Sequence, residues 1–201
     1  EGLAAANSFS QASGGRVDGL QVLLAGNTAV QTQAEQGSTA LANSVQADGA
    51  LQGSAVQVVG NQGSARGAGR DGLANSVRAQ GRGRMAGSNV TVTANQGNAQ
   101  QGVANSVDVA GTLQGGSITI LGNQASVQGE GSKVNSVSGS GSIRGSQILI
   151  AGNTGRASGG GLVNGVHNRG ALAGAQVVIT GNQGSATGGG TVNSVDNRGR
   201  L

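Results

Sequence analysis

The sequence contains no cysteine, no proline, no tryptophan and no tyrosine, and it has one phenylalanine and one methionine. Without cysteine, the chain can form neither disulfides nor cysteine-based metal sites. Without proline, every backbone N–H group is available to a β-ladder, which a proline inside a sheet would interrupt. With a single aromatic ring, the chain lacks the stacking platforms on which proteins bind single-stranded nucleic acid.

Charged residues and long hydrophobic runs are also scarce. Twelve Lys and Arg against eight Asp and Glu give a net charge of +4, and these residues are scattered along the chain. Because they form no basic stripe, we expect no nucleic-acid partner. No run of about 18 apolar residues occurs, so we expect no membrane span.

The residues that usually carry chemistry are few. His167 is the only histidine, and it occupies the repeat position that Asp108 and Asp196 hold elsewhere, so we expect it to be a surface variant. No second His and no Cys can complete a metal site or a catalytic triad with it. The sequence therefore predicts no catalytic residue, no metal site and no cofactor, and a protein that is not an enzyme.

Glycine is abundant, with 41 of 201 residues, and it is periodic. Two short motifs, "NS" and "GN", alternate along the chain without exception. The "NS" motif, with "NG" in one case, recurs at spacings of 36, 32, 30, 30, 29 and 29 residues. Such a period is typical of repeat proteins whose units stack on one another. We predict a single domain, 1–201, of about six and a half repeats, which start near Asn7, Asn43, Asn75, Asn105, Asn135, Asn164 and Asn193.

Aliphatic residues alternate before each "GN", which is typical of a strand with one buried face. The residues that we expect in the core are Val56, Val58, Ile118, Ile120, Ile148, Ile150, Val177 and Ile179. A second apolar segment follows each "NS", with Phe9 in the first repeat and a valine in every later one two residues after the Asn, and a glycine further on. Each repeat is therefore predicted to contain a strand, a short turn, a second strand and a glycine-rich return, without helices.

Stacking of these units predicts an all-β fold, a β-solenoid of coils of about 30 residues with cross-β spacing along its axis. Identical residues then lie above one another, and stacked Asn amides can hydrogen-bond along the axis as a structural ladder. The alternative is that each Asn is simply a turn residue at positive φ. The ladder candidates are Asn43, Asn75, Asn105, Asn135, Asn164 and Asn193 of "NS" and Asn61, Asn123, Asn153 and Asn182 of "GN".

The two ends of the sequence lack a helix, a proline or a block of charge that would cap an open β-coil. We expect Leu3, Phe9, Val195 and Leu201 to lie at polymer ends and to contact further copies of the chain. The sequence begins with Glu1 rather than Met, so we expect a secreted protein whose signal peptide has been removed.

The run "GNQGSA" at 60–65 and 181–186, preceded by alternating Val and Ile, resembles the repeats of bacterial functional amyloids. Curlin repeats carry a related Gly-Asn-x-Ala run in a strand–turn–strand unit, and the repeats of Fap-type fibre proteins are similarly rich in Asn and Gly. The resemblance covers nearly the whole chain, although this repeat is longer than that of curlin. It implies an extracellular fibre subunit of a biofilm matrix or cell-surface coat, with copies of itself and other matrix components as partners.

Two binding modules remain as alternatives. The phrase "NRGAL" at 168–172 is similar to passages in filamentous-haemagglutinin-like adhesins, which are β-helices. An ice-binding solenoid needs flat outward ranks of Thr, and Thr91, Thr93 and Thr119 fit such a rank. The matching outward positions in other repeats are Leu23, Gln57, Leu149 and Val178, which interrupt it.

Overall fold

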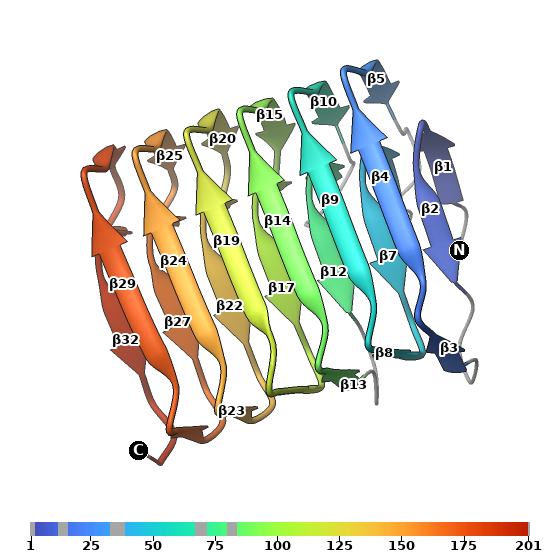
Figure 1. Ribbon diagram of the computed structural model, residues 1–201. Helices are drawn as coiled ribbons and strands as arrows, with labels where there is room; N and C mark the ends of the chain where they lie inside the picture. Colours follow the sequence, from blue (N-terminus) through green and yellow to red (C-terminus); the bar gives the residue numbers. More distant parts are fainter. Residues whose placement is uncertain (1–2, 12–15, 33–38, 67–71, 80–83, 201) are drawn as a thin grey trace.

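The computed structural model describes residues 3–11, 16–32, 39–66, 72–79 and 84–200. Over these residues the chain winds into a β-solenoid and contains no helix, which confirms the predicted fold class. Figure 1 shows the successive coils standing side by side, from the N-terminal coil in blue to the C-terminal coil in red, with the two termini at opposite ends of the stack.

In the described part of the chain, each of the first six coils contributes one short strand to each of five parallel sheets, and the last coil contributes to the first two. We name these sheets A to E in chain order. Sheet A holds β1 (Leu3–Ala6), β6 (Thr39–Ala42), β11 (Gly72–Ala74), β16 (Gly102–Ala104), β21 (Lys133–Val134), β26 (Leu162–Val163) and β31 (Thr191–Val192). Sheet B holds β2 (Phe9–Gln11), β7 (Val45–Ala47), β12 (Val77–Ala79), β17 (Val107–Val109), β22 (Val137–Gly139), β27 (Val166–Asn168) and β32 (Val195–Asn197).

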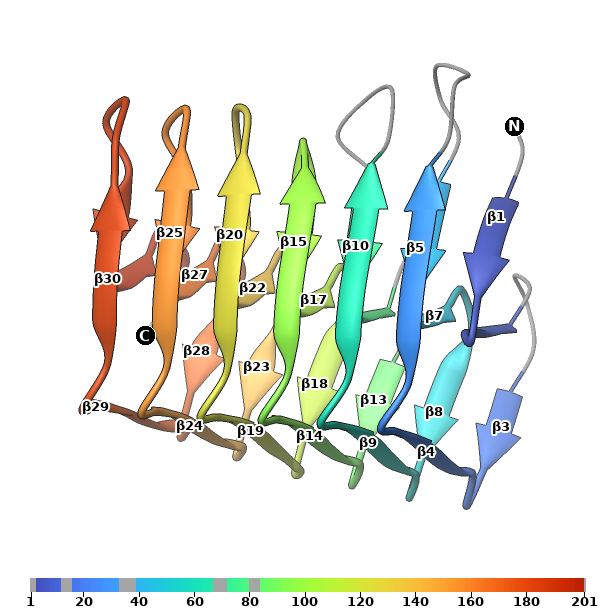
Figure 2. The same cartoon turned by 90° about the horizontal axis from the view of Figure 1, so that it is seen from above.

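The other three sheets follow along each coil, and Figure 2 shows sheet E in front of sheets B and C. Sheet C holds β3 (Arg16–Asp18), β8 (Ala50–Gln52), β13 (Arg84–Ala86), β18 (Thr112–Gln114), β23 (Ile143–Arg144) and β28 (Leu172–Ala173). Sheet D holds β4 (Gln21–Ala25), β9 (Ala55–Val59), β14 (Asn89–Thr93), β19 (Ser117–Leu121), β24 (Gln147–Ala151) and β29 (Gln176–Thr180). Sheet E holds β5 (Thr28–Thr32), β10 (Gln62–Arg66), β15 (Gln96–Gln100), β20 (Gln124–Gln128), β25 (Thr154–Ser158) and β30 (Gln183–Ala186).

The repeat differs from the predicted pair of strands, because five strands form in each of the first six coils of the described chain. Three of its corners are made by residues at positive φ, where glycine and asparagine are the least strained residues. The "NS" Asn makes the corner between sheets A and B, at φ values of 47 to 50°. Glycines make the corners between sheets C and D and between sheets D and E, except that Ala94, at φ 53°, replaces glycine in one D–E corner.

The interior of the coil has two compartments, and Leu41, Leu73 and Val103 of sheet A form a third, small buried cluster. The larger one lies between sheets B, C and D and contains the alternating Val and Ile pairs of sheet D, where Val56, Val58, Ile118, Ile120 and Ile150 are fully buried and Ile148 is 2% exposed. Val177 and Ile179 pack against the same compartment but are only half-buried, because they lie in the outermost strand of sheet D. The second compartment, between sheets E and A, is lined mainly by alanine, which lets these sheets approach closely.

The residues expected at polymer ends lie in the outermost strands where the structure describes them. Leu3 is in β1, Phe9 is half-buried in β2, and Val195 is in β32. Val195 is 50% exposed, whereas Val166, its neighbour in the adjacent coil, is fully buried. Leu201 lies outside the described residues.

Candidate functional site: asparagine columns and a charged corner

The "NS" asparagines form one continuous column, which we call the NS column. Each side-chain amide donates to the Oδ1 atom of its counterpart in the next coil, over distances of 3.0 to 3.3 Å. The column runs through Asn7, Asn43, Asn75, Asn105, Asn135, Asn164 and Asn193. The same residues have positive φ, so they are turn residues and ladder residues at once.

The NS amides also cross the coil to sheet E. Asn75 Nδ2 donates to the carbonyl oxygen of Gln96 at 2.8 Å, and Asn105 Nδ2 donates to that of Gln124 at 2.8 Å. The approach is tight where sheet E carries glycine, since a Cβ atom added at Gly97 would lie 2.5 Å from Asn105 Oδ1. Alanine occupies the same row at Ala29 and Ala125, so the position takes small residues and not glycine alone. These contacts across the coil were not predicted from the sequence.

The "GN" asparagines form a second column, the GN column, which runs through Asn27, Asn61, Asn95, Asn123, Asn153 and Asn182. In its inner coils each Oδ1 atom accepts two hydrogen bonds from the preceding coil. Asn123 Oδ1, for example, accepts from the backbone N–H and from Nδ2 of Asn95, both at 3.0 Å. The second Nδ2 hydrogen of Asn123 is donated to the carbonyl of Val92 at 2.8 Å. Such pairing offsets the cost of burying a polar side chain.

A column of serines accompanies the NS column. Each backbone N–H donates to the Oγ atom of the serine one coil before it, as between Ser76 and Ser44 at 3.1 Å and between Ser106 and Ser76 at 3.2 Å. The hydroxyl in turn donates to the carbonyl two residues earlier, so that it joins two coils and closes its own turn. Together the three columns fix the register of each coil on the next.

This arrangement defines the class of the molecule: it is a β-solenoid whose coils are held in register by internal polar columns. The chain matches no protein-family model, no curated protein and no solved structure. No described helix is long and apolar enough to cross a membrane.

One row of outward residues on sheet B contains most of its charge, and its members are Arg78, Asp108, Ser138, His167 and Asp196. We call this row, together with Lys133 of sheet A, the charged corner. Asp108 is its centre: Oδ1 accepts from Ser138 Oγ at 2.7 Å and from Lys133 Nζ at 3.2 Å, and Oδ2 lies 3.6 Å from Arg78 Nε. Burial by itself would raise the pKa of Asp108, but Lys133, the Ser138 hydrogen bond and Arg78 outweigh it and hold the pKa below its ordinary value.

His167 continues this row, as expected from its repeat position. Its Nδ1 atom lies 2.9 Å from Asp196 Oδ2, and the register places Ser138 on its other side. Ser138 donates its hydroxyl to Asp108 instead of to the imidazole, so this serine is not aligned as a nucleophile. In the described chain, no three His, Asp or Glu side chains gather closely enough to hold a metal ion.

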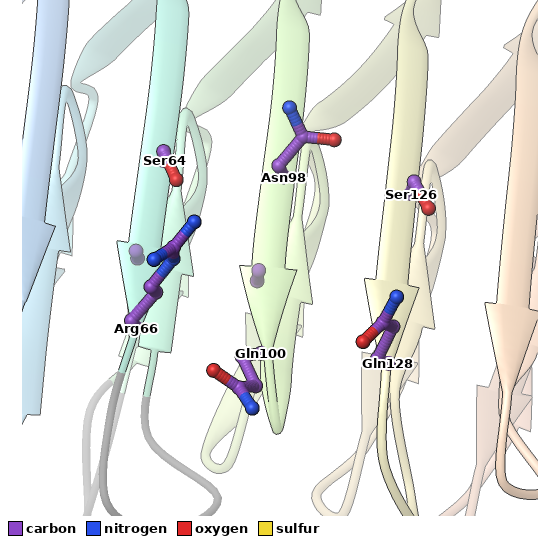
Figure 3. A pocket seen from close by; sticks show the side chains of 8 residues that line it. Ser64, Arg66, Asn98, Gln100, Ser126 and Gln128 are labelled. Carbon is purple, nitrogen blue, oxygen red and sulfur yellow. The ribbon is translucent and has the colours of Figure 1, made fainter.

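The outer faces of sheets E and D are polar or mixed. On sheet E, Ser64, Arg66, Asn98, Gln100, Ser126 and Gln128 line a shallow hollow across β10, β15 and β20 (Figure 3). On sheet D, Thr91 stacks on Thr119, but Gln57 and Leu149 occupy the same row on either side. Thr93 stacks on Leu121. The expected threonine rank is therefore limited to two stacked residues in the row of Thr91 and to one in the row of Thr93.

Proposed function

We propose that the chain is a structural unit of an extracellular, amyloid-like filament in which β-coils stack along one axis, in a biofilm matrix or on a cell surface. The observation that carries the proposal is the contrast along one row of sheet B. Val166 is fully buried and Val195, one coil further, is 50% exposed. A further coil would bury the exposed half of Val195, which contributes about 1 kcal/mol, since complete burial of a valine side chain contributes about 1.5–3 kcal/mol.

The polar columns support the same proposal. Among the described residues, no Asn accepts from Nδ2 of Asn193 as its counterparts in the inner coils do, and no side chain donates to Asn7 Oδ1. One edge thus lacks a donor to Asn7 Oδ1, and the other lacks an Asn acceptor for Asn193 Nδ2, so each edge can supply the group that the other lacks. A coil from another copy, or from a continuation of the same chain, can extend the column through contacts that the inner coils already make.

The sheets also define how two copies would meet. In the described residues, sheets A and B contain seven strands and sheets C, D and E contain six. A copy that sets β1 and β2 on β31 and β32 therefore leaves one layer open in the other three sheets. Seven layers at a spacing of about 4.8 Å give an axial repeat of about 34 Å.

Electron microscopy and fibre diffraction of the concentrated chain test the proposal. We expect unbranched filaments, a meridional reflection near 4.8 Å and a layer line near 34 Å. Val195→Lys should prevent elongation, because it places a charge on the stacking edge. Val178→Lys is the matched control, since Val178 is 51% exposed on the outer side of sheet D.

Two results would contradict this function. The first is a chain that stays dispersed at millimolar concentration with native β circular dichroism. The second is equal elongation by the Val195→Lys and Val178→Lys variants, which would mean that the edge of sheet B takes no part in assembly.

A further inference from the structure

A groove runs along the outer corner between sheets A and B in the last four coils. Two adjoining hollows of about 270 and 310 Å³ share Lys133, His167 and Arg169 among their lining residues. Arg198 and Asp196 line the first hollow, and Asp108 and Ser138 line the second. The glycine-rich segments at 131, 160–161 and 189–190 form the opposite wall, so side chains from the loop side do not fill the groove.

The two arginines of the groove are held by their inner nitrogen atoms. Arg198 Nε donates to Asp196 Oδ2 at 3.2 Å, and Arg169 Nε donates to His167 Nε2 at 3.4 Å. In the part of the chain that the structure describes, the terminal amino groups of these guanidiniums have no partner. Both side chains are exposed, and that of Arg198 is 67% exposed. Each arginine therefore presents the fork that binds a carboxylate in a bidentate manner.

The arginines also lie in successive layers. Asn168 pairs with Asn197, so Arg169 and Arg198, which follow them, are one coil apart, or about 4.8 Å along the axis. Two like charges stacked in neighbouring strands destabilise a sheet. An anion bound between them removes this repulsion, and Lys133 adds a third cation two coils from Arg198.

We propose that this groove binds a carboxylate-bearing polysaccharide, with the carboxylates at the Arg169 and Arg198 forks and near Lys133. An extended polymer fits cations that recur from coil to coil, whereas a single small anion would contact only one or two of them. Asp196 and the Thr191 side chain, which also lines the groove, offer hydrogen bonds to sugar hydroxyls. Nucleic acid fits less well, because the whole sequence has one aromatic side chain and that is Phe9.

The groove is lateral, so its occupation does not depend on axial stacking. Titration calorimetry of the dispersed chain with polygalacturonate tests the proposal, with dextran as the neutral polymer and with galacturonate monomer and inorganic sulfate as small anions. The test variant is Arg169→Gln/Arg198→Gln. The control variant is Arg144→Gln/Arg156→Gln, which removes the same charge from exposed positions on sheets C and E.

We expect polygalacturonate to bind and dextran not to bind, and the affinity of the test variant to fall by about tenfold or more, as expected for the loss of two charge-assisted contacts. The control variant should bind within about twofold of the parent chain. Equal weakening in both variants would overturn the proposal in favour of non-specific attraction, and binding of sulfate or monomer as tight as that of the polymer would reduce the site to a small-anion site. If the double variant does not fold, the single Arg198→Gln variant gives the same comparison.

Discussion

Removal of one amide from the middle of the GN column should destabilise the solenoid far more than removal of an exposed one. Asn123 is fully buried. Its side chain takes part in four hydrogen bonds: two that it accepts from Asn95 and two that it donates, to Val92 O and to Asn153 Oδ1. Asn123→Ala removes all four.

The cost follows from the groups left without partners. In the Asn123→Ala variant the backbone N–H of Asn95, one Nδ2 hydrogen of Asn95 and the carbonyl of Val92 lose their buried partners. Each such group costs about 1–3 kcal/mol, and water that enters the vacated space recovers part of this. We therefore expect a loss of about 3–5 kcal/mol, a large part of the 5–15 kcal/mol that is typical of a domain.

Urea unfolding followed by far-ultraviolet circular dichroism measures this loss, since the chain has no Trp or Tyr for fluorescence. Hydrogen exchange of the Asn95 amide adds a local readout and should speed up in the variant. The matched control is Asn98→Ala, because Asn98 is exposed on sheet E and belongs to the next strand after the Asn95 corner. It should change stability by less than about 0.5 kcal/mol. A loss below about 1 kcal/mol for Asn123→Ala, or equal losses in the two variants, would refute the reasoning.

Two further predictions concern backbone strain and pH. Ala94→Gly should stabilise the fold by about 0.5–1 kcal/mol, because Ala94 has a φ of 53°, which strains a residue with a Cβ atom. Gly122→Ala, at the equivalent corner, should destabilise the fold by about 1 kcal/mol through the same backbone strain, since an added Cβ would meet nothing within 4 Å. Thermal unfolding measures both changes, and effects of the same sign would refute this explanation. Because the pKa of Asp108 is lowered, the stability that it contributes is present above its ordinary pKa and disappears as the pH falls through the folded-state pKa. Asp108→Asn should therefore lower the free energy of unfolding at pH 7 by about 1 kcal/mol, and this difference should disappear as the pH falls below the lowered pKa of Asp108. A difference that stays constant down to acid pH would exclude the ion-pair explanation.

The fold class could be predicted from the sequence because the "NS" and "GN" motifs recur at the period of one coil. The valine and isoleucine pairs of sheet D lie in register, as their constant distance from "GN" indicated. The five-strand path did not follow, because segments such as Val77–Ala79 are too short for an alternation to be recognised. They are strands only because the neighbouring coils supply their hydrogen-bond partners.

The candidate sites were likewise predicted in part. The two explanations for the "NS" asparagines were treated as alternatives, but in Asn105 the positive φ and the column coexist, since the backbone turn leaves the side chain free to point along the axis. His167 was correctly placed in the row of Asp108 and Asp196 from its repeat position. Its relation to Lys133 could not be predicted, because Lys133 approaches that row from sheet A across the corner.

The asparagine columns make the two edges of the solenoid chemically different. In both columns Nδ2 of one coil donates to Oδ1 of the next, so the amide dipoles point the same way and reinforce one another along the axis. One edge therefore presents acceptors and the other presents donors. Two copies can extend the columns only head to tail, and a twofold dimer joined edge to edge would set like groups against each other. A filament built from this chain is expected to be polar, with two distinguishable growing ends.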